Sequence, residues 1–179
     1  MSGLTMLGQV LHEEHFRILV CICDLQNRVV GQAGERTFNP DDDREHEEMH
    51  GLIGSLDRVL AHHAFEENVI FPLIRGDGDP DVADLLEEEH VEIEPTTQRL
   101  RAVTVNILQH GPSNGRWSEF RTLAQKLFSQ MLGHLEKEEA IILQRLDRLL
   151  DAATDHRLAS QHLSSRLVPA VASSSGMPR

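Results

Sequence analysis

Tyrosine is absent from this 179-residue chain, tryptophan occurs once, and aromatic residues make up only 4% of the sequence. The two cysteines, Cys21 and Cys23, stand two positions apart, so on a helix they point away from each other and form neither a disulfide framework nor a CxxC motif. The longest strongly apolar run, residues 18–23, is far too short to cross a bilayer, and no basic region precedes an apolar stretch at the N-terminus. These absences predict a soluble, cytoplasmic protein without a membrane partner.

Basic residues are also scarce. Lysine and arginine number 17 against 29 acidic residues, which gives a formal net charge of −12. Such a charge repels phosphate backbones, so nucleic acid is excluded as an expected partner. The hydrophobic fraction of 40% is close to that of ordinary globular proteins and excludes general disorder. The length suits one domain of about 150 residues followed by a tail.

Apolar residues recur at spacings of three and four along four long segments, and no stretch alternates with the period of a strand. We therefore predict an all-α fold, an up-down-up-down four-helix bundle with antiparallel neighbours. A short fifth helix is expected around residues 154–167, but Ser164-Ser165 and residues 168–179, rich in Ser, Pro and Ala, have the composition of a disordered tail. The four main segments run from about Leu4 to Val30, from near Asn39-Pro40 to Gly76, from Asp79-Pro80 to just before Gly111, and from about Trp117 to Asp151.

The chain contains 11 histidines, and the predicted buried face of each main helix includes one of them. These are His15, His63, His90 and His134. Two of them are followed four residues later by a glutamate, Glu67 after His63 and Glu138 after His134, which puts each pair on one helical face. His110, His156 and His162 receive no role.

Two glutamates without partners in one small core would destabilise the domain by several kcal/mol. The distances along the helices show that they can share a partner. At about 1.5 Å per residue, His15 lies about 22 Å from the end of its helix and His63 about 25 Å from the start of the next. The distances from the histidines to the connecting turns match equally well for the second and third helices and for the third and fourth. In an antiparallel bundle all six side chains therefore fall in one layer. Imidazoles and carboxylates without a thiolate suit Fe, Mn or Zn, and two carboxylates placed to bridge suggest two metal ions.

These residues resemble the hemerythrin-like, or HHE cation-binding, family. The resemblance covers about residues 11–146 and rests on Glu14-His15, on His63 and Glu67 followed by Val69-Ile70-Phe71-Pro72, on Glu89-His90, and on His134 followed by Glu138-Glu139. It implies a bundle over residues 1–151, with a short helix and flexible tail over 152–179. It also implies two iron ions joined by an oxo or hydroxo bridge, with His15, His63, His90 and His134 as terminal ligands and Glu67 and Glu138 as bridges.

Several choices of ligand stay open within this interpretation. His62 and Glu66 form a competing pair, about 100° around the helix from His63 and Glu67, and Glu139 competes with Glu138. Glu94 stands where oxygen-carrying members have a further histidine, so the site either lacks that imidazole or uses Glu94 instead. His12, one turn before His15, is a candidate for orienting a ligand. Ferritin-like di-iron proteins are the nearest competing class, but they use Glu-x-x-His motifs and more carboxylates.

The expected function is binding of a small diatomic molecule or peroxide at the iron pair, with redox sensing or the destruction of peroxide or NO as the outcome. Catalase-like activity is one form this would take. The alternative is an iron storage, delivery or repair protein that uses the same site. A third hypothesis, from a different class, is a helical interaction module whose His and Glu layer is only a buried polar network.

Overall fold

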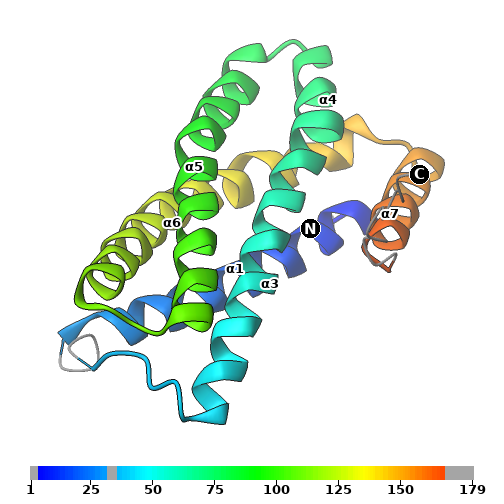
Figure 1. Ribbon diagram of the computed structural model, residues 1–179. Helices are drawn as coiled ribbons and strands as arrows, with labels where there is room; N and C mark the ends of the chain where they lie inside the picture. Colours follow the sequence, from blue (N-terminus) through cyan, green and yellow to red (C-terminus); the bar gives the residue numbers. More distant parts are fainter. Residues whose placement is uncertain (1–3, 32–35, 168–179) are drawn as a thin grey trace, which may run out of the picture.

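The computed structural model describes residues 4–31 and 36–167, and within these ranges it contains helices and no strand (Figure 1). The all-α prediction is confirmed. Residues 168–179, predicted as a tail, lie outside the described residues. The elements are α1 (Met6–Val29), α3 (Asp43–Phe65), the π-helix η1 (Glu66–Ile70), α4 (Phe71–Gly76), α5 (Pro80–His110), α6 (Asn114–Leu149) and α7 (Ala152–Leu167).

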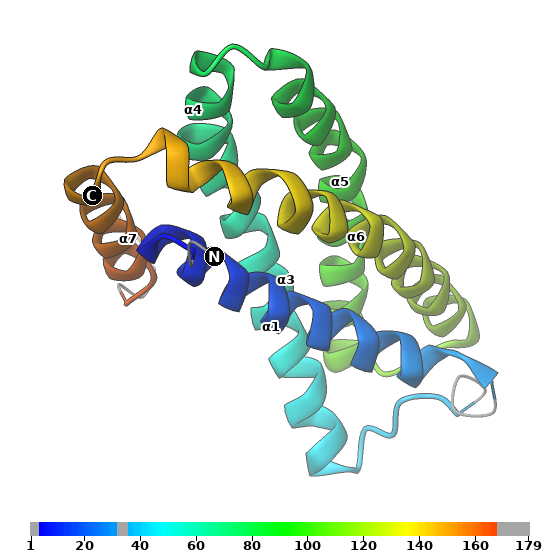
Figure 2. The same cartoon turned by 180° about the vertical axis from the view of Figure 1, so that it is seen from behind.

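Four helical rods form the bundle, because α3, η1 and α4 follow one another as one continuous rod. Helix α1 packs against α6 and α3, and α5 packs against α6 and α3, so the order around the bundle is α1, α6, α5, α3. Figure 1 shows α3 and α5 side by side in front of α1 and α6, and Figure 2 shows the α1 and α6 pair from behind. This is the predicted four-helix bundle. Within residues 4–31 and 36–167, none of the helices combines the length and the hydrophobicity that a membrane span requires.

Two helix starts differ from the sequence prediction. Helix α3 begins at Asp43, because the Asp42 carboxylate accepts hydrogen bonds from the backbone N–H groups of Arg44 and Glu45. The side chain of Asn39 instead accepts from the N–H of Asp41 in the turn before it. Helix α6 begins three residues earlier than predicted, at Asn114, with Ser113 as its cap.

The rod formed by α3 and α4 widens at η1, where the N–H of Phe71 bonds the carbonyl of Glu66, five residues back. Pro72 follows directly and has no N–H to offer the carbonyl of residue 68, so an undisturbed α-helical ladder is not available here. Single π-helical turns of this kind are often found at functional sites. Here the turn contains Glu66 and Glu67.

Two apolar clusters fill the bundle, one on each side of a polar layer. The larger contains Ile18, Ile93 and Leu135, and the smaller contains Leu11 and Ile142. His15 therefore lies between Leu11 and Ile18 on α1, and Glu138 lies between Leu135 and Ile142 on α6. The polar layer thus crosses the hydrophobic core itself.

Helix α7 packs against α1 at the end of the bundle (Figures 1 and 2). It begins two residues before the expected helix, at Ala152, and it includes Ser164 and Ser165, which have the composition of a tail. Leu158 and Ala159 of α7 join the smaller apolar cluster. The Asp155 carboxylate accepts hydrogen bonds of 2.8 Å from the backbone N–H groups of both Met6 and Leu7, at the N-terminus of α1.

Replacing Asp155 tests this contact. In Asp155→Ala, two N–H groups of the first turn of α1 lose their acceptor, so the free energy of unfolding should fall by about 1 kcal/mol, the ordinary value of a helix cap. Urea denaturation measures the change, with Glu136→Ala, an exposed position on α6, as the control. Equal stability of Asp155→Ala and the unchanged protein would show that α7 does not support α1 in this way.

Candidate metal centre

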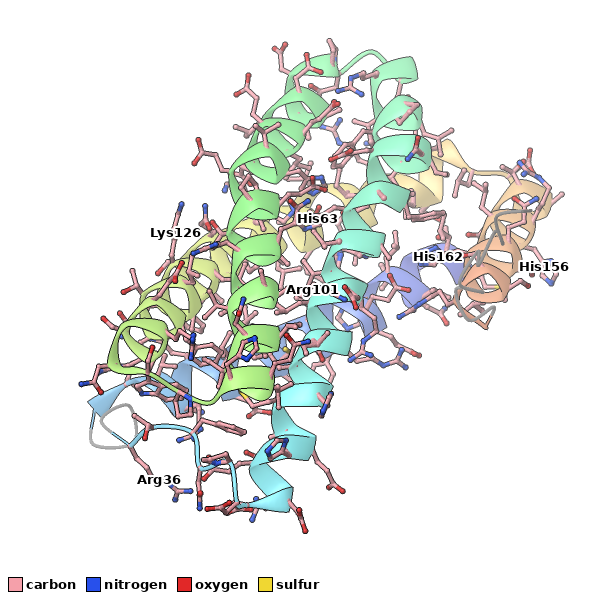
Figure 3. All side chains as sticks on the ribbon, viewed as in Figure 1. Arg36, His63, Arg101, Lys126, His156 and His162 are labelled. Carbon is pink, nitrogen blue, oxygen red and sulfur yellow. The ribbon has the colours of Figure 1, made fainter. Side chains whose placement is uncertain are left out.

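Seven side chains with nitrogen or oxygen donors form the polar layer, and each is at most 4% exposed. They come from all four rods of the bundle, and Figure 3 labels one of them, His63, in the interior between α3 and α5. Their donor atoms form three overlapping groups, each compact enough to hold a cation. The seven are His15, His62, His63, Glu66, His90, His134 and Glu138.

One side of the layer contains His15 of α1 and His62 of α3. Their Nε2 atoms lie 3.1 Å apart. The same two nitrogens face one oxygen of Glu66, with His62 Nε2 at 3.3 Å and His15 Nε2 at 3.8 Å from Oε1. His15 Nε2 is also 3.5 Å from Oε2 of Glu138. Two imidazoles and two carboxylate oxygens thus converge at this position.

The other side contains His63, His90 and His134. The Nε2 atoms of His90 and His134 lie 3.0 Å apart, and the His63 ring stacks on that of His90 with 3.8 Å between centroids. Oε1 of Glu138 is 3.0 Å from His134 Nε2, and Oε2 of Glu66 is 3.6 Å from His90 Nε2. His63, His90 and His134 form one compact donor group at the second position, and the two carboxylates form another with His90 and His134.

Glu66 and Glu138 connect the two positions. Each of them directs one carboxylate oxygen to the imidazoles of one side and its other oxygen to the imidazoles of the other side. Neither Glu66 nor Glu138 has a hydrogen-bond partner of good geometry for either oxygen among the described residues. Both ring nitrogens of His63 also lack such a partner there. Buried polar atoms without partners are costly, and a pair of cations would satisfy the four carboxylate oxygens and one nitrogen of His63. The donor set fits Fe, Mn or Zn.

Four carboxylates outside the layer orient four of the imidazoles. His15 Nδ1 donates to Glu139 at 2.7 Å, and His62, His90 and His134 donate through Nδ1 to Glu14, Glu67 and Glu89, each at 2.9 Å. A carboxylate only accepts, so each of these imidazoles carries a proton on Nδ1, and Nε2, the atom left to bind a cation once it is deprotonated, points into the layer. This is the tautomer that a metal ligand requires.

These four hydrogen bonds form a closed cycle around the bundle. His15 of α1 bonds a glutamate of α6, and His134 of α6 bonds a glutamate of α5. His90 of α5 bonds a glutamate of η1, and His62 of α3 bonds a glutamate of α1. Each bond crosses between neighbouring helices. The packing of the bundle therefore fixes the direction in which each Nε2 points.

A comparison with protein families identifies the domain. Residues 9–146 match the model of the hemerythrin HHE cation-binding domain. The chain belongs to this family. The resemblance inferred from the sequence is thereby confirmed, and the hemerythrin-like domain accounts for the buried cation-binding layer.

This hemerythrin-like chain is also similar to a curated protein, the iron-sulfur cluster repair protein DnrN of Neisseria gonorrhoeae. The two are 29% identical over 105 residues, which cover 55% of this chain and 66% of that protein. The chain thus spans just under two thirds of its relative's length. No solved structure matches the chain.

The hemerythrin-like layer contains five of the six residues singled out from the sequence: His15, His63, His90, His134 and Glu138. Glu67 is outside it. The side chain of Glu67 is 33% exposed and accepts from Nδ1 of His90, whereas Glu66 is fully buried at the centre. His62, which competed with His63 on sequence grounds, is inside the layer together with His63.

Helix geometry explains this difference. At about 100° per residue, His63 is about 100° around the helix from His62, Glu66 about 40° and Glu67 about 140°. If both histidines face inward, Glu66 lies between them and Glu67 lies beyond His63. The sequence prediction placed one histidine of each helix in the layer, and His63 has Glu67 four residues after it. The adjacent His62-His63 pair is the feature of the sequence that could have indicated Glu66.

Four more side chains near the layer have defined positions. Glu139 contacts His15 Nδ1 from outside the layer, and His12 donates to the second oxygen of Glu139 at 2.8 Å. Glu94 is in none of the three donor groups found among the described residues. His162, which had no role in the sequence pattern, is buried and donates through Nε2 to Glu14 at 2.7 Å.

Protons compensate the buried carboxylates when the layer holds no cation. Burial alone lowers the pKa of His15, but the hydrogen bond to Glu139 and the nearby carboxylates of Glu66 and Glu138 raise it to about 10. Burial works in the opposite direction on Glu138, whose pKa lies far below its usual value because of its contacts with His134 and the other imidazoles. Burial and the neighbouring histidines lower the pKa of His63. His15 is thus protonated at pH 7, while His63 is neutral.

Metal binding should therefore release protons. A pKa of about 10 means that His15 carries a second proton at pH 7, and that proton must leave before Nε2 can bind a cation. We expect about one proton or more to be released per chain when Zn²⁺ is added to metal-free protein at pH 7. Calorimetric titrations in buffers of different ionisation enthalpy give this number. Binding without proton release would contradict the charge state deduced for His15.

Proposed function

We propose that this hemerythrin-like protein holds two iron ions, one between His15 and His62 and the other among His63, His90 and His134, with Glu66 and Glu138 bridging them. The observation that carries the proposal is the split of each buried carboxylate, one oxygen facing each imidazole group. This ligand set replaces Glu67 by Glu66 and adds His62 to the set proposed from the sequence.

The two positions differ in their number of protein donors. Two imidazoles face the first and three face the second. The His15–His62 position therefore has more room for an exogenous ligand. Bound iron would supply a redox-active Lewis acid to which O2, peroxide or NO can bind. We propose that such a small ligand binds here, for redox sensing or for destruction of peroxide or NO.

A small pocket lies beside the hydrogen bond between His62 and Glu14. It measures about 20 Å³, and its other lining residues include Arg17, Cys21 and Arg58. This volume admits about one water-sized molecule. None of the other six donors of the polar layer lines this pocket, so it lies outside the layer. Cys21 and Cys23 are free thiols, which supports a location in the reducing cytoplasm.

A second candidate function is iron delivery or repair. It is favoured by the relative, which is named an iron-sulfur cluster repair protein. In this case, the two iron ions would be cargo loaded and released by the same donors. The four hydrogen bonds that orient the imidazoles would then mainly determine how tightly iron is bound.

A matched pair of substitutions tests the ligand set. Glu66→Gln removes a bridging charge from the centre, so bound iron should fall from about two per chain to one or fewer. Glu67→Gln changes only the partner of His90 Nδ1, so two irons should still bind, with affinity about 10–100-fold weaker. Elemental analysis and titration with Fe²⁺ measure both. Loss of iron in Glu67→Gln with full iron in Glu66→Gln would reverse the assignment.

The two functions differ in what happens to the iron. Anaerobic Fe²⁺-loaded protein is exposed to NO or peroxide and, separately, to an iron-free acceptor protein. A ligand-binding or detoxifying protein should change its absorption spectrum or consume peroxide while keeping its iron. Transfer of iron to the acceptor without turnover would favour delivery or repair. If fully iron-loaded protein gave neither of these results, both functions would be contradicted.

A further inference from the structure

Helix α7 lies outside the family domain in sequence but in space contacts Glu14, which orients an imidazole of the polar layer. The family match ends at residue 146, and α7 spans Ala152–Leu167. Even so, α7 packs on α1, and Figure 3 labels His162 on the side of α7 that faces the bundle, with His156 on the opposite side. The HHE domain itself therefore does not account for what α7 contributes.

The contact between α7 and the domain centres on Glu14 of α1. Oε2 of Glu14 accepts from His62 Nδ1 at 2.9 Å. Oε1 accepts from Nε2 of His162 at 2.7 Å and from the guanidinium of Arg166. One oxygen therefore orients an imidazole of the polar layer, and the other is held by two donors from α7.

His162 is itself held in place. Its side chain is 6% exposed, and its ring packs against that of Phe65 with centroids 3.9 Å apart. Phe65 is the last residue of α3, three residues after His62. Helix α3, which carries His62, thus also holds the ring of His162 in place through Phe65.

Glu14 differs from the three other carboxylates that orient imidazoles. The side chains of Glu67, Glu89 and Glu139 are 25–34% exposed, so water can solvate them. The side chain of Glu14 is only 4% exposed. A carboxylate removed from water needs protein donors to keep its charge and its orientation. For Oε1 of Glu14, the donors are on α7.

We propose that His162 and Arg166 are positioning residues that hold Glu14, and through it His62, so that α7 controls metal binding at the His15–His62 position. The inference rests on the proposed function, since it concerns one of the two metal positions proposed there. It makes the two positions inequivalent, because contacts from α7 reach the imidazole pair on one side only.

Zn²⁺ titration of the full-length protein tests this, because Zn²⁺ is diamagnetic and leaves the histidine NMR signals sharp. The variants are His162→Ala and the double variant His162→Ala/Arg166→Ala. We expect the Kd of one of two Zn²⁺ ions to rise about 10–100-fold and that of the other to stay unchanged. The Nδ1 proton of His62 should shift and exchange faster with water, while the Nδ1 protons of His15, His90 and His134 keep their positions.

Two further variants separate positioning from a general loss of stability. In His162→Gln, the side-chain amide can donate where Nε2 did, so both Zn²⁺ affinity and the His62 signal should return toward normal. In His156→Ala, an exposed residue of α7 is removed, and neither readout should change. Folded His162→Ala with an unchanged His62 signal and unchanged Zn²⁺ affinities would overturn the proposal. So would an equal weakening of both Zn²⁺ ions.

Failure of the proposed function would look different. If the unchanged protein bound no Zn²⁺ and no Fe²⁺, the proposed metal centre would be wrong. The His62 Nδ1 proton of metal-free protein would still report the contact between α7 and Glu14. An unaltered signal there in His162→Ala would reject the positioning role independently.

Discussion

Two carboxylates in the middle of a hydrophobic core constrain the whole structure. Glu66 and Glu138 have no exposure to solvent, and apolar clusters lie on both sides of them. Their charges must be compensated inside the bundle, and five imidazoles surround them for this purpose. Protons on His15 and His134 can provide the compensation, and so can a pair of cations. Cation binding is therefore expected to stabilise the fold, because it would satisfy the same atoms.

The cycle of four hydrogen bonds connects this layer to the helix packing. Each bond joins the Nδ1 of one helix's histidine to a glutamate of the neighbouring rod, so no imidazole in the cycle is oriented by its own helix. A shift of one helix would turn the lone pair of an imidazole away from the centre. The family fold thus acts as a rigid frame for its donors, and α7 adds a further support at Glu14.

Much of this organisation could be predicted from local sequence patterns. The histidines at 15, 90 and 134 interrupt apolar stripes, and helix lengths alone place them at one depth. Glu66 was missed because its angular position depends on whether one or both of His62 and His63 face inward, and a periodic pattern does not decide that. His162 was missed for another reason. Its partner Glu14 is 148 positions away, and α7 has only a weak amphipathic pattern.

We expect two cations between Glu66 and Glu138. Anomalous X-ray scattering at the iron edge, from crystals of iron-loaded protein, would locate them. Two iron peaks should appear roughly 3.5–4 Å apart, one near His15 and His62 and the other near His90 and His134. A single peak, or iron bound away from the two carboxylates, would contradict this expectation.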